Sequence, residues 1–241
     1  MGNDITYEDL QIAFEDNHIL VVVKPQGVPC QADESGAPDM VNLLKEYLKK
    51  KYDKPGEAWL GLVHRLDRMT GGVMVFAKTS KAAERLCKAI QDGEVEKKYF
   101  AILEGVPRYN ADKLTCYLKW YPDEKAVKVV PQLTEGAKYA ELDYKVLSKK
   151  DKFSLVSVNL VTGRKHQIRV QMKDMGTPVL GDKRYGTGKY NVPMCLWAAE
   201  LRFTHPVSGQ TMTFRAYPPE NPAWGMFDYT PFLSVTIGNA Y

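Results

Sequence analysis

Two short, continuous apolar runs constrain the fold of this chain more than any other feature of its sequence. Ile19–Val23 reads ILVVV and Val73–Ala77 reads VMVFA. Runs of this length, the first of them rich in β-branched residues, predict buried strands. No run comes near the about 18 consecutive apolar residues of a membrane-spanning helix, so the sequence predicts no membrane partner.

Helical and alternating patterns surround these two runs. Asp39 is placed to cap a helix whose apolar residues recur at helical spacing up to Leu48, and Thr79 or Ser80 to cap a second helix that ends by Gly93. Further strands are expected at 97–105, 140–147 and 155–161, and a hairpin or insertion at 113–138. The order is rich in strands without strict β-α-β alternation, which predicts an α+β fold with a mixed, mostly antiparallel sheet.

Length and composition leave the class of the protein broad. The 241 residues contain no internal repeat and no convincing linker, so we expect a single domain over residues 1–241. The four cysteines are too far apart in sequence to suggest a metal or redox pair, which favours reduced thiols in a cytoplasmic protein. The formal net charge of +4 permits a nucleic-acid partner without requiring one. No large exposed apolar stripe is evident, so a monomer is expected.

One candidate for chemistry is the segment HRLDRMTGG at 64–72, which places Asp67 between Arg65 and Arg68 ahead of a buried strand. An aspartate before threonine and glycine is a common turn residue. The less common alternative is a nucleophile held ionised by neighbouring cations. The segment alone leaves both interpretations open.

A second candidate is the donor-rich segment 160–186. It contains HQIRV at 166–170, which fits either a strand or a helix, and GDKRYG at 181–186, a turn that fits either phosphate contact or a solvated loop. His166 is open as a base, although a structural or RNA-contact role is more common. No Gly-rich phosphate motif, metal-ligand constellation or serine-nucleophile motif occurs, so we expect no metal and no cofactor.

Taken in order, five segments resemble the RluA-type pseudouridine synthases over roughly residues 14–217. That family shows an acidic opening before an apolar strand and KP-x-G, then HRLD-x-x-TSG, K-x-Y-x-A, TGR-x-HQIR with GD-x-x-YG, and L-x-F-x-HP. The corresponding segments here are EDNHILVVVKPQG (15–27), HRLDRMTGGVMVFAK (64–78), KKYFAILEG (97–105), LVTGRKHQIRVQMKDMGTPVLGDKRYG (160–186) and LRFTHP (201–206).

The resemblance implies an enzyme that isomerises specific uridines in ribosomal or transfer RNA to pseudouridine. It implies that Asp67 is the catalytic aspartate, that Tyr99 stacks on the uracil, and that Arg169 pairs with the aspartate. It also implies that Arg65 helps to flip the target base. RNA contacts are expected from Arg164, Lys165, Lys183 and Arg184, and the expected substrate-binding set is completed by His64, Thr70, His166 and Gln167. The implied fold is a mixed α+β sheet with a central cleft, as a stand-alone catalytic domain without an N-terminal S4 domain.

The departures from the family pattern avoid these chemical residues. Gly71 replaces the usual serine of TSG, and Gln171 replaces the histidine that is common after IRV. Cys30 and Gln31 lie where many members have a histidine after KP-x-G. Trp197 and Ala198 replace part of the LHA that often precedes L-x-F-x-HP in the family. They bear on local hydrogen bonds and RNA preference rather than on the reaction.

Two rival functions are compatible with parts of the same sequence. The first is a non-catalytic RNA-binding protein on the same fold, which the presence of Asp67 disfavours. The second is a hydrolase that pairs Asp67 with another carboxylate such as Asp182. The sequence does not choose the target RNA, nor whether Asp67 attacks the base or the sugar or removes a proton.

Overall fold

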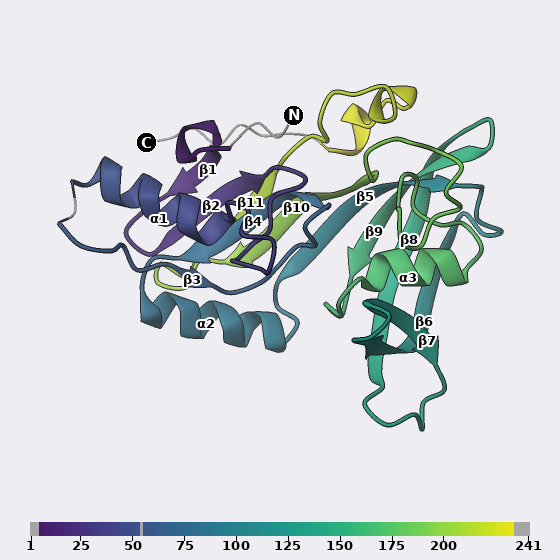
Figure 1. Cartoon of the computed structure of the whole chain (residues 1–241), viewed down its shortest axis with the longest axis horizontal. Helices are drawn as coiled ribbons and strands as arrows, with labels where there is room; N and C mark the ends of the chain where they lie inside the picture. Colours follow the sequence, from purple (N-terminus) through teal and green to yellow (C-terminus); the bar gives the residue numbers. More distant parts are fainter. Residues whose placement is uncertain (1–4, 54, 234–241) are drawn as a thin grey trace. The chain divides into compact units, whose positions relative to one another are not determined.

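The two apolar runs form neighbouring strands, β2 (Ile19–Lys24) and β4 (Gly71–Ala77), and every residue of both is buried. They pair antiparallel from Ile19 opposite Ala77 to Lys24 opposite Gly72. The computed structural model describes residues 5–53 and 55–233 (Figure 1). Within it the chain forms two compact units. One holds the residues up to Glu96 with Glu200–Phe214, and the other holds Lys97–Ala199 and the residues from Arg215 onward.

The first unit is built on the strand order β1, β2, β4 and β10, with β3 also paired to β4 and β11 to β10. Its remaining strands are β1 (Gln11–Glu15), β3 (Gly61–Leu62), β10 (Leu196–Thr204) and β11 (Thr211–Arg215), the last two of which straddle the division between the units. The short 3-10 helix η1 (Tyr7–Asp9) precedes β1.

Two helices accompany these strands, and both begin at predicted caps. The carboxylate of Asp39 accepts from the Asn42 N–H at the start of α1 (Met40–Lys51), and the Thr79 hydroxyl accepts from the Ala82 N–H at the start of α2 (Ser80–Gln91). Helix α1 buries its apolar residues at helical spacing, namely Met40, Leu43, Leu44 and Leu48. The predicted helical patterns of this unit are therefore confirmed.

The second unit follows the strand order β10, β5, β9, β8, β6 and β7. Its strands are β5 (Glu96–Glu104), β6 (Ala111–Tyr121), β7 (Ala126–Val130), β8 (Lys138–Lys150) and β9 (Phe153–Leu160). The polar region 113–138 is thus a hairpin of β6 and β7 that leads into β8. Helix α3 (Gln167–Asp174) packs on this hairpin through Val170, which joins Leu118, Val127 and Ala140 in one apolar cluster. Two short 3-10 helices, η2 (Trp224–Met226) and η3 (Thr230–Phe232), end the described chain.

The α+β class expected from the sequence is confirmed, because paired strands dominate both units and only three α-helices accompany them in the described residues. The segment HQIRV, which fitted either a strand or a helix, lies in helix α3. Across residues 5–53 and 55–233, none of the helices combines the length and apolar character needed to cross a membrane.

A buried carboxylate connects β1 to α1 in the first unit. The side chain of Glu15 is 6% exposed and accepts from Lys51 Nζ at 2.7 Å and Lys78 Nζ at 2.6 Å. The hydroxyls of Tyr47 and Tyr52 donate to it at 2.9 and 2.7 Å. Burial raises the pKa of Glu15, but the hydrogen bonds from Lys51, Lys78 and the two tyrosines outweigh burial and lower it to about 2.

His205, from the predicted LRFTHP segment, ties the end of β10 to the β1–β2 turn. Its Nε2 lies 2.9 Å from Oδ2 of Asp16, while its Nδ1 accepts from the Ser208 N–H at 2.9 Å. The other carboxylate oxygen of Asp16 accepts from the N–H groups of His18 and Ile19. These contacts give this motif histidine a structural role within the first unit.

The Glu15 cluster generates a stability prediction. We expect Glu15→Gln to lower the free energy of unfolding at pH 7 by about 2 kcal/mol, the order of a hydrogen-bonded buried charge. The folded pKa of about 2 lies below the ordinary 4.5, so the carboxylate contributes fully above about pH 4.5 and its contribution is lost as the pH falls toward 2. The variant should therefore lose part of this acid dependence in urea titrations. Glu57→Gln is the control, because Glu57 is 82% exposed and lies 3.9 Å from Lys49; equal effects of the two variants would contradict the prediction.

Candidate active site

The loop that carries Asp67 connects β3 to β4. It has no regular secondary structure and is fixed by hydrogen bonds to its backbone, several of them from side chains. The Thr70 N–H donates to the Asp67 carbonyl at 2.9 Å and closes a turn directly before β4. The Val75 N–H donates to Nε2 of His64 at 3.1 Å, which holds the start of the loop against the same strand. Within this loop Arg65 is exposed, Asp67 is partly buried and Thr70 is buried.

Lys24 supplies the strongest restraint on this loop. Its side chain is fully buried, and Nζ donates to the carbonyls of Val28 at 2.7 Å, Pro25 at 2.9 Å and Arg68 at 3.1 Å. Burial lowers the pKa of Lys24 to about 8, while Asp67 is among the neighbours that oppose this shift. The ammonium therefore connects the KPQG turn to the residue that follows Asp67.

Two further residue pairs complete the restraint on the loop, each through two hydrogen bonds. The Gly27 N–H donates to the Arg68 carbonyl at 2.8 Å, and Arg68 Nε donates back to the Gly27 carbonyl at 2.8 Å. The Sγ of Cys30 donates to the Leu66 carbonyl at 3.2 Å and accepts from the Leu66 N–H at 3.3 Å. The backbone on both sides of Asp67 is thus anchored, at Leu66 and at Arg68.

In the second unit, the loop before α3 is organised by Gln167. Its Oε1 accepts from the Thr162 hydroxyl at 2.8 Å and the Arg164 N–H at 3.0 Å, while Nε2 donates to the Glu141 carbonyl at 3.0 Å. His166 precedes the helix in the left-handed backbone region, at φ 54°. These contacts give Gln167 a structural role, and a direct contact with substrate stays a prediction.

Arg169 lies on α3 and forms a buried ion pair with Asp182. Its Nε and Nη2 donate to the two carboxylate oxygens at 2.7 and 2.9 Å. Asp182 also accepts from the N–H groups of Arg184 and Tyr185. Burial raises the pKa of Asp182, but Arg169 and these two N–H groups outweigh burial and lower it. The cations of the GDKRYG turn are conspicuous in the sequence. In the structure, however, it is the carboxylate of this turn, Asp182, that holds Arg169.

Tyr185 joins Arg169 to the β6–β7 hairpin. Its hydroxyl accepts from the Val127 N–H at 2.8 Å and lies 2.8 Å from Nδ1 of His166. The guanidinium carbon of Arg169 lies 5.0 Å from the centre of its ring. A neutral His166 that accepts the hydroxyl proton keeps its own N–H on Nε2.

The remaining predicted residues of the second unit differ in exposure and in the contacts that they make. Tyr99 is buried on β5, opposite Val158 of β9. Lys183 and Arg184 are exposed in the GDKRYG turn. Arg164 donates from Nε to the Tyr139 carbonyl at 2.9 Å, and Lys165 Nζ lies 3.2 Å from the centre of the Trp120 ring.

The predicted site residues thus fall into two groups. His64, Arg65, Asp67 and Thr70 share one loop of the first unit, and the others belong to the second unit. The pairing of Arg169 with Asp67 and the approach of Tyr99 stay predictions from the resemblance. Lys24, Cys30, Asp182 and Tyr185 were missed as site-supporting residues, although all four lie within or beside motifs that the sequence analysis quoted.

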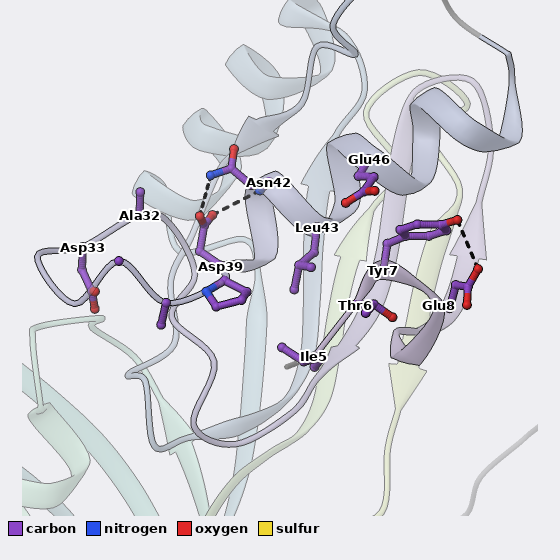
Figure 2. A pocket seen from close by; sticks show the side chains of 13 residues that line it. Ile5, Thr6, Tyr7, Glu8, Ala32, Asp33, Asp39, Asn42, Leu43 and Glu46 are labelled. Carbon is purple, nitrogen blue, oxygen red and sulfur yellow. Dashed lines mark hydrogen bonds between the residues drawn. The ribbon is translucent and has the colours of Figure 1, made fainter. Parts of the chain in front are cut away.

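A surface hollow of about 660 Å³ lies elsewhere in the first unit, between η1, α1 and the loop that precedes α1 (Figure 2). Tyr7, Asp33, Asp39, Leu43 and Glu46 are among the residues that line it. The Asp39 carboxylate accepts from the backbone and side-chain amides of Asn42 at 3.2 and 2.6 Å. None of the predicted site residues lines this hollow.

Comparisons with known proteins agree with the family suggested by the motifs. The pattern of the family described as RNA pseudouridylate synthase matches residues 18–174. An uncharacterized RNA pseudouridine synthase of Aquifex aeolicus is 34% identical over 88% of this chain and 70% of its own length. The ribosomal large subunit pseudouridine synthase C of Buchnera aphidicola is also 34% identical, over 83% of this chain and 65% of its own length.

A solved structure agrees as well. That of human RNA pseudouridylate synthase domain containing 4 superposes with a TM-score of 0.73 at 25% identity, covering 87% of this chain and 88% of the other. The chain therefore belongs to the RluA-type RNA pseudouridine synthase family, and its activity class is that of an isomerase.

The contacts of Lys24 generate a prediction about the Asp67 loop. We expect Lys24→Met to accelerate amide hydrogen exchange at residues 64–70 and to lower the free energy of unfolding by roughly 2 kcal/mol, because the Val28 and Pro25 carbonyls lose this buried donor. Exchange mass spectrometry on the folded protein measures the first effect. The exposed Lys50 provides the control variant Lys50→Met. Unchanged protection of residues 64–70 in Lys24→Met would show that the loop does not depend on the ammonium.

Proposed function

We propose that the chain converts specific uridines of structured ribosomal or transfer RNA to pseudouridine, with Asp67 as the catalytic carboxylate. The observation that supports this most is the restraint of the Asp67 backbone by Lys24, Gly27 and Cys30. The loop has no regular structure, but it is fixed at the residues before and after Asp67. This holds the backbone of the aspartate in one position and limits where its carboxylate can reach. Such preorganisation is what a reacting group requires.

The reaction is an isomerisation that needs no cofactor. The bond between C1′ of the ribose and N1 of the uracil breaks, the ring turns within the site, and C1′ bonds to C5. The proton lost from C5 is balanced by the proton gained at N1. Asp67 acts as nucleophile or base at the first of these steps.

The other proposed roles follow from the chemistry of each side chain. Tyr99 offers a flat apolar ring with a polar tip, which suits holding a detached uracil. A uridine within a stacked RNA must leave the stack before it reacts, and the exposed guanidinium of Arg65 is suited to fill the vacated position. Lys165, Lys183 and Arg184 are exposed cations that suit contacts with phosphates.

Arg169 is proposed to keep Asp67 ionised. A carboxylate that loses its water shell tends to gain a proton, and a neighbouring guanidinium opposes this. The ion pair with Asp182 supports the role, because it holds the guanidinium in place through Nε and Nη2.

The hydrolase that pairs Asp67 with Asp182 is disfavoured. A general acid in such a hydrolase needs a raised pKa. The side chain of Asp182 is fully buried in its ion pair with Arg169, and its pKa is lowered. Asp182 therefore acts better as an anchor than as a proton donor.

The choice of ribosomal RNA follows the Buchnera relative, which is named a ribosomal large subunit pseudouridine synthase. We expect a strain without the gene to lose pseudouridine at one or a few positions of large-subunit ribosomal RNA or transfer RNA. Chemical mapping at single-nucleotide resolution measures this. The wild-type gene should restore the sites, whereas an Asp67→Ala gene should not. Restoration by Asp67→Ala would refute the role of this carboxylate, and release of free uracil from RNA would favour the hydrolase.

The proposed pairing of Arg169 with Asp67 has its own test. We expect Arg169→Met to raise the pKa of Asp67, because the neighbouring positive charge is lost. Carboxyl-labelled NMR titration measures the shift, and Arg169→Lys should keep the pKa closer to that of the wild type because it keeps the charge. An Asp67 pKa that is the same in all three folded proteins would exclude the pairing.

A further inference from the structure

One end of the second unit concentrates positive charge around exposed aromatic rings. It consists of the residues after β5 (106–110), the β8–β9 turn with its flanking residues (149–153) and the loop 187–190, which we call the basic end. These segments contain five cations and a single carboxylate, Asp151. A second carboxylate, that of Glu104, borders them and accepts from the Thr187 hydroxyl. Positive charge is therefore still in excess. The cations are Arg108, Lys149, Lys150, Lys152 and Lys189.

Hydrogen bonds and ring contacts hold the three segments together. The Gly105 N–H donates to the Lys152 carbonyl at 2.8 Å, and Lys149 Nζ donates to Oδ1 of Asn110 at 2.8 Å. Lys152 Nζ lies 5.2 Å from the centre of the Tyr190 ring, which itself packs edge-on against Phe153 at 5.3 Å. The three segments of the basic end therefore lie beside one another in the second unit.

The cations of the basic end lack the carboxylate partner that some of the other exposed lysines have. Lys88, Lys113 and Lys128 each lie 2.6 Å from a carboxylate oxygen. Among residues 5–53 and 55–233, none of the five cations of the basic end forms an ion pair. Like charges gathered without counter-charges repel one another, and an anionic partner removes this cost.

The aromatic side chains indicate which anion fits. Tyr109 is 53% exposed, and the guanidinium carbon of Arg108 lies 5.4 Å from the centre of its ring. Rings interleaved with cations provide both stacking surfaces for bases and charges for phosphates, a combination that nucleic acid uses more fully than an acidic protein or a lipid surface.

We propose that the basic end binds the phosphate backbone of the RNA substrate at a distance from the reacting uridine. This rests on the proposed function, in which Tyr99 holds the uracil. Tyr99 and Glu104 are five residues apart on β5, which is about 17 Å along a strand, and Glu104 pairs with Phe153 of the basic end. The enzyme thus contacts RNA beyond its target nucleotide, with phosphates at the cations and unpaired bases at the rings.

The test uses the full chain and a fluorescent RNA stem-loop with uridines in the loop and single-stranded flanks on both sides of the stem. We expect Lys149→Glu with Lys150→Glu to weaken binding at least about tenfold at about 0.1 M salt. The slope of log affinity against log salt should fall by about 2, since two phosphate contacts are lost. The matched control reverses two exposed lysines of the first unit, Lys50→Glu with Lys81→Glu. Thermal melting confirms that both double variants are folded.

The outcomes separate this proposal from the proposed function. Unchanged affinity and salt slope in Lys149→Glu with Lys150→Glu would overturn the basic end as an RNA surface. So would an effect confined to anionic vesicles or to poly-glutamate. Equal loss in the control pair would also overturn it, because the effect would then follow from net charge alone. If the wild type modifies no RNA but the Lys149/Lys150 variant still loses binding and slope, the surface is supported and the proposed reaction fails.

Discussion

A single buried ammonium group is the interaction on which the arrangement around Asp67 depends. Lys24 ends β2 and places its charge among three backbone carbonyls, one of which belongs to Arg68. Burying an isolated charge is unfavourable, so the group is retained only where acceptors surround it. Here the acceptors come from the turn after β2 and from the loop before β4, so one charge fixes the relation between the two segments. The rigidity of the apolar strands is thereby transmitted to a loop that has no regular hydrogen bonding of its own.

The second unit also buries a positive charge, but a carboxylate compensates it instead of backbone carbonyls. Arg169 is almost fully buried, and its counterpart is a carboxylate that also accepts from two backbone N–H groups. Removing either member would leave a charge without its partner in the protein interior, which is costly. The planar guanidinium and the carboxylate fix each other's orientation through two parallel hydrogen bonds, a restraint that an ammonium cannot provide. Tyr185 extends the arrangement to the β6–β7 hairpin, so α3 is held on both sides.

The sequence predicted much of the local structure, and the reasons for its failures are specific. Strands β2 and β4 were predictable because continuous apolar runs have few alternatives, and α1 and α2 because their caps and spacing agree. Helix α3 was ambiguous because Gln167 to Met172 are buried on all sides, so no amphipathic pattern distinguishes a helix from a strand. The partner of Arg169 was missed because its carboxylate lies 13 residues away, beside two conspicuous cations. Motif order supplied Asp67, Tyr99 and Arg169, whereas distances between residues remote in sequence are set by tertiary packing that no local pattern encodes.

The path of the chain through the two units also determines when each unit is completed on the ribosome. Strand β4 is next to β10 in the order of strands, and β10 reaches the first unit only at Glu200. The contact between Asp16 and His205 likewise joins residues that emerge far apart in time. Until residues 200–204 have been synthesised, the nascent first unit therefore exposes the part of the β4 edge that β3 does not cover at Phe76 and Ala77. An unpaired apolar edge is a site of aggregation, so folding of this protein during synthesis depends on the interval between those two events.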